Sequence, residues 1–184
     1  ISNHLDCEPY RFCRKMVQPS IVYSLHQEPM SAVAQKPNLP DNEIRCWLQK
    51  NYSMDGLLEP LPGECDLNFK LSTKDGEAFV CKISSGSGNH EILVAQNEIL
   101  TLLNPRDLAT IPRVLTSIQG ESIVPLKPKH TDAGLSYVGR LLTFVPGKPL
   151  AKCAPYSGPL IRNLGRTVGR INQALAGYDH PAFH

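Results

Sequence analysis

The sequence lacks a long apolar run, a strong net charge and any C-x-x-C pair of cysteines. No stretch of its 184 residues approaches the roughly 18 uncharged apolar residues that a membrane span needs. A formal net charge of +2 is too small to create a strong cationic field, so neither a nucleic acid nor an anionic membrane is indicated as a partner. We therefore expect an ordinary soluble globular protein.

The six cysteines also show no histidine spacing suited to zinc. Cys46 and Cys81 fall within segments of apolar periodicity, where a buried thiol is the ordinary interpretation. A reducing compartment fits this usage best, and we expect a cytoplasmic protein.

The length suits one domain or part of a larger one. The chain starts at Ile1 and stops at His184, shortly after a predicted helix, so we expect both ends to be cut. Residues 1–40 have no sustained period and carry prolines among polar residues. This composition predicts a disordered leader.

From Asp41 onward the pattern predicts regular structure. A short amphipathic helix begins at Asp41, with Ile44, Trp47 and Leu48 on one face. Strands are predicted at 57–61, 67–71 and 78–83, the last after an Asp75-Gly76 hairpin turn. A second helix follows from about residue 91 and ends near Asn104. Further strands are predicted at 111–116, 122–124 and 137–145.

The chain leaves the last strand at Pro146-Gly147 and forms a final helix that begins near residues 157–159. Its apolar residues share one face. Arg162, Arg166 and Arg170, spaced by four on another face, are interpreted as a solvated rim rather than a nucleic-acid stripe.

Lys82 is the most informative residue of the third strand. The period of two places it on one face with Val80, in the middle of an apolar strand. A lysine there either reaches out to solvent at an edge or has an anion or carbonyl group at its ammonium. The Gly-rich loop at 84–90 has neither P-loop nor dinucleotide-binding spacing, and is interpreted as a linker.

Three segments in order resemble the N-lobe motifs of aminoglycoside-phosphotransferase-like kinases, closest to the hydroxylysine-kinase-like branch. They are residues 60–69 (PLPGECDLNF), 79–83 (FVCKI) and 139–150 (GRLLTFVPGKPL), and the resemblance covers about residues 41–184. It implies an α+β, protein-kinase-like N-lobe with an antiparallel sheet of about five strands and one helix at 41–147. Residues 148–184, after the hinge, would begin a helical C-lobe.

The resemblance also implies a nucleotide site. Lys82 would contact the α- and β-phosphates of ATP or GTP, and the loop of Gly63, Glu64 and Cys65 would cover them, because a glycine lets backbone amides approach closely. Val80 would touch the adenine ring.

The adenine end of this site would use the main chain of the hinge. The resemblance implies Leu142 as gatekeeper, Thr143 as carbonyl acceptor and Val145 as amide donor.

Two departures from the family pattern stand out. The helix position that commonly holds a glutamate for the strand lysine is Gln96, which adds no charge, and Glu91 and Glu98 remain alternatives. The H-x-D-x-x-x-x-N run and later Asp of the family are absent, and His130-Thr-Asp132 is taken as a loop coincidence. The Mg²⁺ ligands are therefore expected outside this chain, which alone is predicted to be inactive.

We expect the intact protein to phosphorylate a hydroxyl of a small amine or amino acid. The alternative is a non-catalytic nucleotide-binding or scaffold domain. Some relatives resemble fusions with a PLP-dependent aminotransferase-like domain, so such a partner domain is an expectation. A protein kinase is less favoured because no G-x-G-x-x-G loop precedes the lysine strand.

Overall fold

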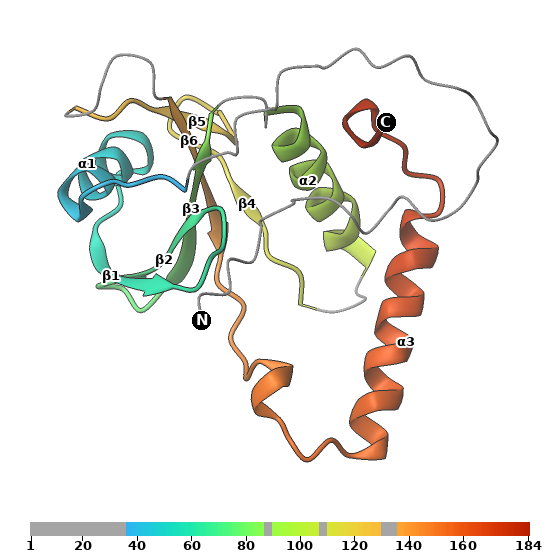
Figure 1. The fold of residues 1–184 in the computed structure, drawn as a ribbon. Coiled ribbons are helices and arrows are strands. Elements are labelled where there is room, and N and C mark those ends of the chain that lie inside the picture. Colours follow the sequence, from blue (N-terminus) through green and yellow to red (C-terminus); the bar gives the residue numbers. More distant parts are fainter. Residues whose placement is uncertain (1–35, 87–89, 107–109, 130–135) are drawn as a thin grey trace, which may run out of the picture.

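The computed structural model describes residues 36–86, 90–106, 110–129 and 136–184 (Figure 1). The α-helices are α1 (Asp41–Tyr52), α2 (His90–Leu103) and α3 (Gly158–Leu175). The strands are β1 (Gly56–Leu61), β2 (Leu67–Thr73), β3 (Ala78–Ser85), β4 (Val114–Leu115), β5 (Val124–Leu126) and β6 (Tyr137–Thr143). Short 3-10 turns are η2 (Asn104–Arg106), η3 (Leu150–Lys152) and η4 (Pro181–Phe183).

All six strands of the described residues join one antiparallel sheet. Its order is β1-β2-β3-β6-β4, and β5 also pairs with β6. Each predicted strand is present, although β4 is shorter than the expected 111–116 and β6 ends at Thr143 rather than at residue 145. The central pair is β3 and β6, in which Lys82 lies directly opposite Arg140.

Helix α1 packs on one face of this sheet. Its predicted apolar residues Ile44, Trp47 and Leu48 are all buried and belong to the main core cluster. Trp47 lies against Gly139 of β6, and its Nε1 donates to the carbonyl of Pro125 at 3.1 Å. The indole is thus held by packing and by a hydrogen bond to β5.

Helix α2 contacts the opposite face. Arg140 follows Gly139 on β6, so its side chain points away from α1, and it reaches α2 with hydrogen bonds to Gln96 and Asn97. The sheet therefore lies between two helices (Figure 1).

A disordered leader was expected to extend through residue 40, but residues 36–40 are packed against the fold. Leu39 is 7% exposed and belongs to the core cluster, and Pro37 is also buried. Residues 36–40 are thus part of the fold because Leu39 covers apolar surface beside α1. Residues 1–35 lie outside the described residues.

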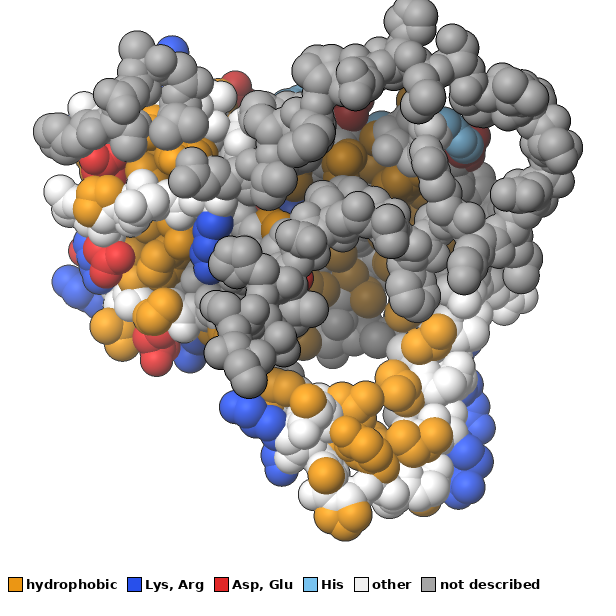
Figure 2. Space-filling view, in the orientation of Figure 1, with side chains coloured by type: hydrophobic (Ala, Val, Ile, Leu, Met, Phe, Trp, Pro, Cys, Tyr) orange, Lys and Arg blue, Asp and Glu red, His pale blue; other side chains and the backbone are white. Residues whose placement is uncertain are grey.

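After β6 the chain runs through η3 to α3, which extends away from the sheet (Figure 1). Ser157 caps α3, since its Oγ accepts from the amide of Leu160 at 3.3 Å. Arg162, Arg166 and Arg170 are exposed, as the solvated-rim interpretation requires, and Figure 2 shows basic side chains along the outer side of this helix.

The two cysteines expected to be buried behave differently. Cys81 on β3 is fully buried, which raises the pKa of its thiol to about 12. The expectation was wrong for Cys46, which is exposed because it lies on the solvent side of α1. Among the described helices none is both long enough and apolar enough to cross a bilayer.

Candidate functional site

Lys82 is held by two oxygen-bearing side chains. Its Nζ donates to Oδ1 of Asn68 at 2.8 Å and lies 3.3 Å from Oδ2 of Asp66. The Lys82 side chain is 26% exposed, so the ammonium group is partly desolvated but reachable from solvent. The structure therefore favours a lysine that holds an anion over one that only reaches out to water.

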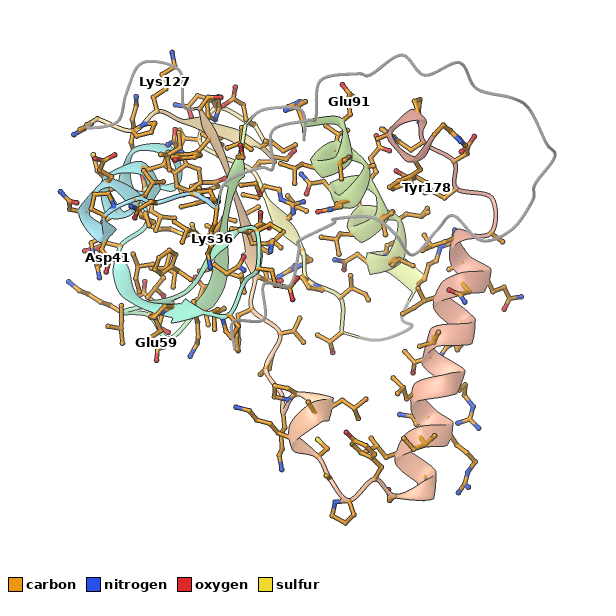
Figure 3. All side chains as sticks on the ribbon, viewed as in Figure 1. Lys36, Asp41, Glu59, Glu91, Lys127 and Tyr178 are labelled. Atoms are coloured by element: carbon orange, nitrogen blue, oxygen red, sulfur yellow. The ribbon has the colours of Figure 1, made fainter. Side chains whose placement is uncertain are left out.

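The loop between β1 and β2 lies beside this lysine. A Cβ added to Gly63 would sit 2.2 Å from Nδ2 of Asn68 and 2.5 Å from the carbonyl oxygen of Asp66, so the backbone here approaches closely because residue 63 has no side chain. Lys36 donates to the Gly63 carbonyl at 2.6 Å (Figure 3). Glu64 and Cys65, at the tip of the loop, are exposed.

Asn68 links the loop to the strand lysine. Its Nδ2 donates to the carbonyl of Pro62 at 3.1 Å while its Oδ1 accepts from Lys82. In the sheet register Asn68 lies directly opposite Lys82, which explains why the two side chains meet. The loop is thus tied to the lysine through the amide group of Asn68 as well as through the carboxylate of Asp66.

Gln96 on α2 has a different partner from the one its sequence position suggests. Its Oε1 accepts from Nη2 of Arg140 at 2.7 Å, and Asn97 Oδ1 accepts from Nη1 at 2.8 Å. Glu98 accepts from Tyr178 at 2.9 Å, and Figure 3 shows Glu91 at the start of α2, pointing away from the strands. The carboxylate that meets Lys82 is Asp66, which comes from the loop and not from the helix.

Val80 and Leu142 lie on the same face of the sheet as Lys82, which is called the lysine face below. They lie opposite each other across β3 and β6, two residues along from the pair of Lys82 and Arg140. Because side chains two residues apart on a strand share a face, Val80, Leu142 and Lys82 form one continuous surface. Leu142 is 8% exposed, so it is the buried member of this surface.

The segment after Leu142 offers main-chain groups. The amide of Thr143 donates to the carbonyl of Arg113 at 2.9 Å, and its Oγ1 accepts from the Arg113 amide at 2.9 Å. Within the described part of the chain the amide of Val145 makes no hydrogen bond. Val145 follows Leu142 by three residues, and its amide is available as a donor.

The described ranges contain no group of three or more His, Cys, Asp or Glu side chains that could hold a metal ion. The stretch His130-Thr-Asp132 lies outside the described residues. The residues on the lysine face fit the phosphates and base of a nucleotide, whereas no metal ligand set is formed by the residues described.

A separate pocket of about 630 Å³ lies between α2, β4 and the C-terminal segment. Tyr178 forms one wall, and its single hydroxyl proton has two acceptors within reach, the Ala95 carbonyl at 3.2 Å and Glu98 Oε2 at 2.9 Å (Figure 3). None of the residues predicted to contact the nucleotide lines this pocket.

A profile of the phosphotransferase enzyme family (APH) matches residues 58–184, which is more than half of the chain. The chain belongs to this family. The resemblance to aminoglycoside-phosphotransferase-like kinases is thereby confirmed, and the matched range contains the lysine strand, the loop before it and the segment after Leu142.

The curated relatives that the chain matches include hydroxylysine kinases from several vertebrates. The chain is 27% identical over 160 residues to the one from Danio rerio, covering 83% of this chain and 43% of the relative. It is 29% identical over 134 residues to the one from Mus musculus, covering 67% and 35% respectively. The chain thus spans less than half the length of these relatives.

Two solved kinases share the fold. Amicoumacin kinase hAmiN, in complex with AMP-PNP, Ca²⁺ and Ami, matches with a TM-score of 0.65 at 15% identity, covering 77% of this chain and 41% of its own. A microcompartment-associated aminopropanol kinase matches with a TM-score of 0.58 at 15% identity, covering 78% and 43%. The predicted α+β, kinase-like fold is confirmed.

The side chains around the lysine that sequence reasoning did not single out are Lys36, Asp66, Asn68 and Arg140. Asn68 and Arg140 carried a usable signal, since each is a polar residue within an apolar strand at a position that shares the face of Lys82. The sequence carried no comparable signal for Lys36 and Asp66. Both lie in irregular segments, where periodicity does not predict the direction of a side chain.

Proposed function

We propose that this chain is the nucleotide-binding lobe of a small-molecule kinase. The observation that carries the proposal is a half-buried ammonium group, Lys82, on the same face as the apolar pair Val80 and Leu142. A nucleotide has the complementary arrangement, with an anionic phosphate chain attached to a flat apolar base. Membership of the phosphotransferase family supports this assignment.

Each predicted residue then has a physical role. The nucleotide, ATP or GTP, supplies the phosphoryl group, and Lys82 neutralises charge on its α- and β-phosphates. The backbone at Gly63, Glu64 and Cys65 covers the phosphates. Phosphoryl transfer also needs Mg²⁺, whose ligands we expect outside this chain.

At the other end, Val80 and Leu142 pack against the base. The Val145 amide donates to the ring and the Thr143 carbonyl accepts from its amino group. Gln96 acts at a distance, through Arg140, by fixing α2 over this face.

For the intact protein we propose a phosphate acceptor that is a hydroxyl of a small amine or amino acid. The relatives named hydroxylysine kinase and the structural neighbour named aminopropanol kinase both point to an amino alcohol. We further propose a cytoplasmic protein, in which a PLP-dependent aminotransferase-like domain is a candidate fusion partner.

A second function, a non-catalytic nucleotide-binding or scaffold domain, is favoured by one observation. Gln96 and Asn97 bind Arg140 through neutral amides, so the helix contributes no carboxylate to Lys82 among the described contacts. A lysine without a helix carboxylate is positioned by fewer charges.

Calorimetric titration of ATP and GTP into the chain tests nucleotide binding. We expect binding that Lys82→Ala weakens at least tenfold, because about 1.4 kcal/mol of phosphate contact corresponds to a factor of ten. Lys74→Ala removes the same charge from the exposed turn between β2 and β3 and serves as the matched control. Equal affinity of the Lys82→Ala variant and the unmodified chain would reject the site.

Transfer of labelled phosphate by the intact protein separates the kinase from the non-catalytic alternative. Hydroxylysine and short amino alcohols are the first acceptors to test. Nucleotide binding without transfer to any hydroxylated amine would support the non-catalytic alternative.

A further inference from the structure

The ammonium group of Lys82 is already occupied by a carboxylate. Asp66 Oδ2 lies 3.3 Å from Nζ, and the two side chains are exposed by only 29% and 26%. Asp66 immediately precedes β2 and belongs to the loop that would cover the phosphates. An internal anion therefore stands where the phosphate of a bound nucleotide would have to lie.

A carboxylate and a phosphate cannot share this position without cost. The ammonium group has three donors, and Asn68 and Asp66 already engage it. A carboxylate and a phosphate oxygen held at the same ammonium group are like charges in close proximity, and they repel each other. A phosphate oxygen that binds Lys82 must therefore displace Asp66, whereas the neutral amide of Asn68 can remain.

The backbone around Asp66 indicates how the displacement occurs. The Asp66 carbonyl lies against Gly63, and the Gly63 carbonyl is bound by Lys36 at 2.6 Å. Asn68 adds a second tie through its hydrogen bond to Pro62. These ties hold the loop, so rotation of the Asp66 side chain is sufficient to release Lys82.

We propose that Asp66 is an internal competitor for the phosphate position at Lys82 and thereby sets the affinity of the chain for phosphate-bearing ligands. The inference rests on the proposed nucleotide site and deepens it. Asn68 is the positioning residue that keeps the ammonium aimed at this position when Asp66 leaves.

The test compares ATP with adenosine, which has the base and ribose but no phosphate, by calorimetric titration of the 184-residue chain. Asp66→Asn keeps the shape of the side chain and removes its charge. We expect it to bind ATP about two- to tenfold more tightly, the range expected when a partly exposed ion pair no longer competes. Its affinity for adenosine should not change.

Glu59→Gln is the matched control. Glu59 pairs with Lys70 at 3.3 Å on the same hairpin, so this variant loses the same charge from an ion pair of the same length. An equal gain for ATP in Glu59→Gln would attribute the effect to net charge and overturn the inference. Asp66→Ser, which is smaller and also neutral, provides a second variant should Asp66→Asn melt at a lower temperature.

The remaining outcomes separate the two proposals. If ATP binds in a Lys82-dependent manner but Asp66→Asn gives no gain, or gives the same gain for adenosine, the competitor is rejected and the nucleotide site stands. If neither the unmodified chain nor Asp66→Asn binds ATP, the proposed function itself is rejected, and the competitor with it.

Discussion

Gly139 sets the distance between α1 and the sheet by having no side chain. A Cβ at this position would lie 2.4 Å from Cζ2 and 2.5 Å from Cη2 of Trp47, far inside van der Waals contact. The indole is 6% exposed and hydrogen-bonded to Pro125, so it has no room to retreat. One missing methyl group therefore determines how closely the helix approaches β6.

Gly139→Ala is expected to lower the free energy of unfolding by about 1–3 kcal/mol, the usual cost of overpacking a core. Gly165→Ala in α3 is the control, because its added Cβ would meet nothing within 4 Å. That variant should instead gain about 0.5–1 kcal/mol, since alanine loses less backbone entropy in a helix. Denaturant unfolding measures both, and equal effects of the two substitutions would contradict the packing argument.

Strand β3 and helix α1 together bury two groups that resist ionisation. Burial raises the pKa of the Cys81 thiol to about 12, and burial, followed by the nearby Cys81 and Glu121, raises the pKa of the Tyr52 hydroxyl. Both groups stay neutral in the folded protein at a pH where the unfolded chain ionises them. This interface between α1 and the sheet is therefore sensitive to alkali.

A thiol with a raised folded-state pKa stabilises the fold fully below its unfolded pKa of 9.0, and the contribution declines as the pH rises toward about 12. The loss in the free energy of unfolding that Cys81 causes should reach about 2 kcal/mol at pH 10.5, because each pH unit above the unfolded pKa contributes about 1.36 kcal/mol. Unfolding measured at pH 7 and pH 10.5 should show a smaller loss for Cys81→Ala than for the unmodified chain. Cys46→Ala, at an exposed position, should leave the loss unchanged, and a Cys81→Ala loss as large as the original would refute the assignment.

At the scale of the whole molecule, α3 and the turn before it leave apolar side chains uncovered. The large side chains among them are Leu150, Tyr156, Ile161, Leu164 and Val168, exposed by 39–51%. Figure 2 shows hydrophobic side chains gathered on the inner side of α3, opposite its basic outer side. A contiguous patch of this kind promotes association.

We expect the 184-residue chain to self-associate through this patch. The double variant Leu164→Gln/Val168→Gln removes apolar surface from its centre and should shift the sedimentation profile toward monomer. Arg166→Gln changes the same helix on its basic side and should leave association unchanged. A monodisperse, monomeric unmodified chain would contradict the expectation.

Much of the fold follows from local patterns. The alternation in β2 and β3, the Asp75-Gly76 turn and the apolar stripe of α1 each predict their element, because side-chain periodicity reports directly which face is buried. The face shared by Lys82 and Val80 follows in the same way. Strand ends were less well predicted, since β4 and β6 stop where their pairing stops and not where apolar residues do.

The sequence by itself determined the family, the sheet with its inward lysine and the residue types available to a nucleotide. Only the tertiary structure decided the partners: Asp66 and Asn68 at Lys82, and Arg140 at Gln96. The physical reason is that periodicity is a local property of the sequence, whereas side-chain partners come from distant segments. Periodicity specifies the direction of a side chain within its own element, but an ion pair depends on which segments the folded chain brings within about 4 Å of each other.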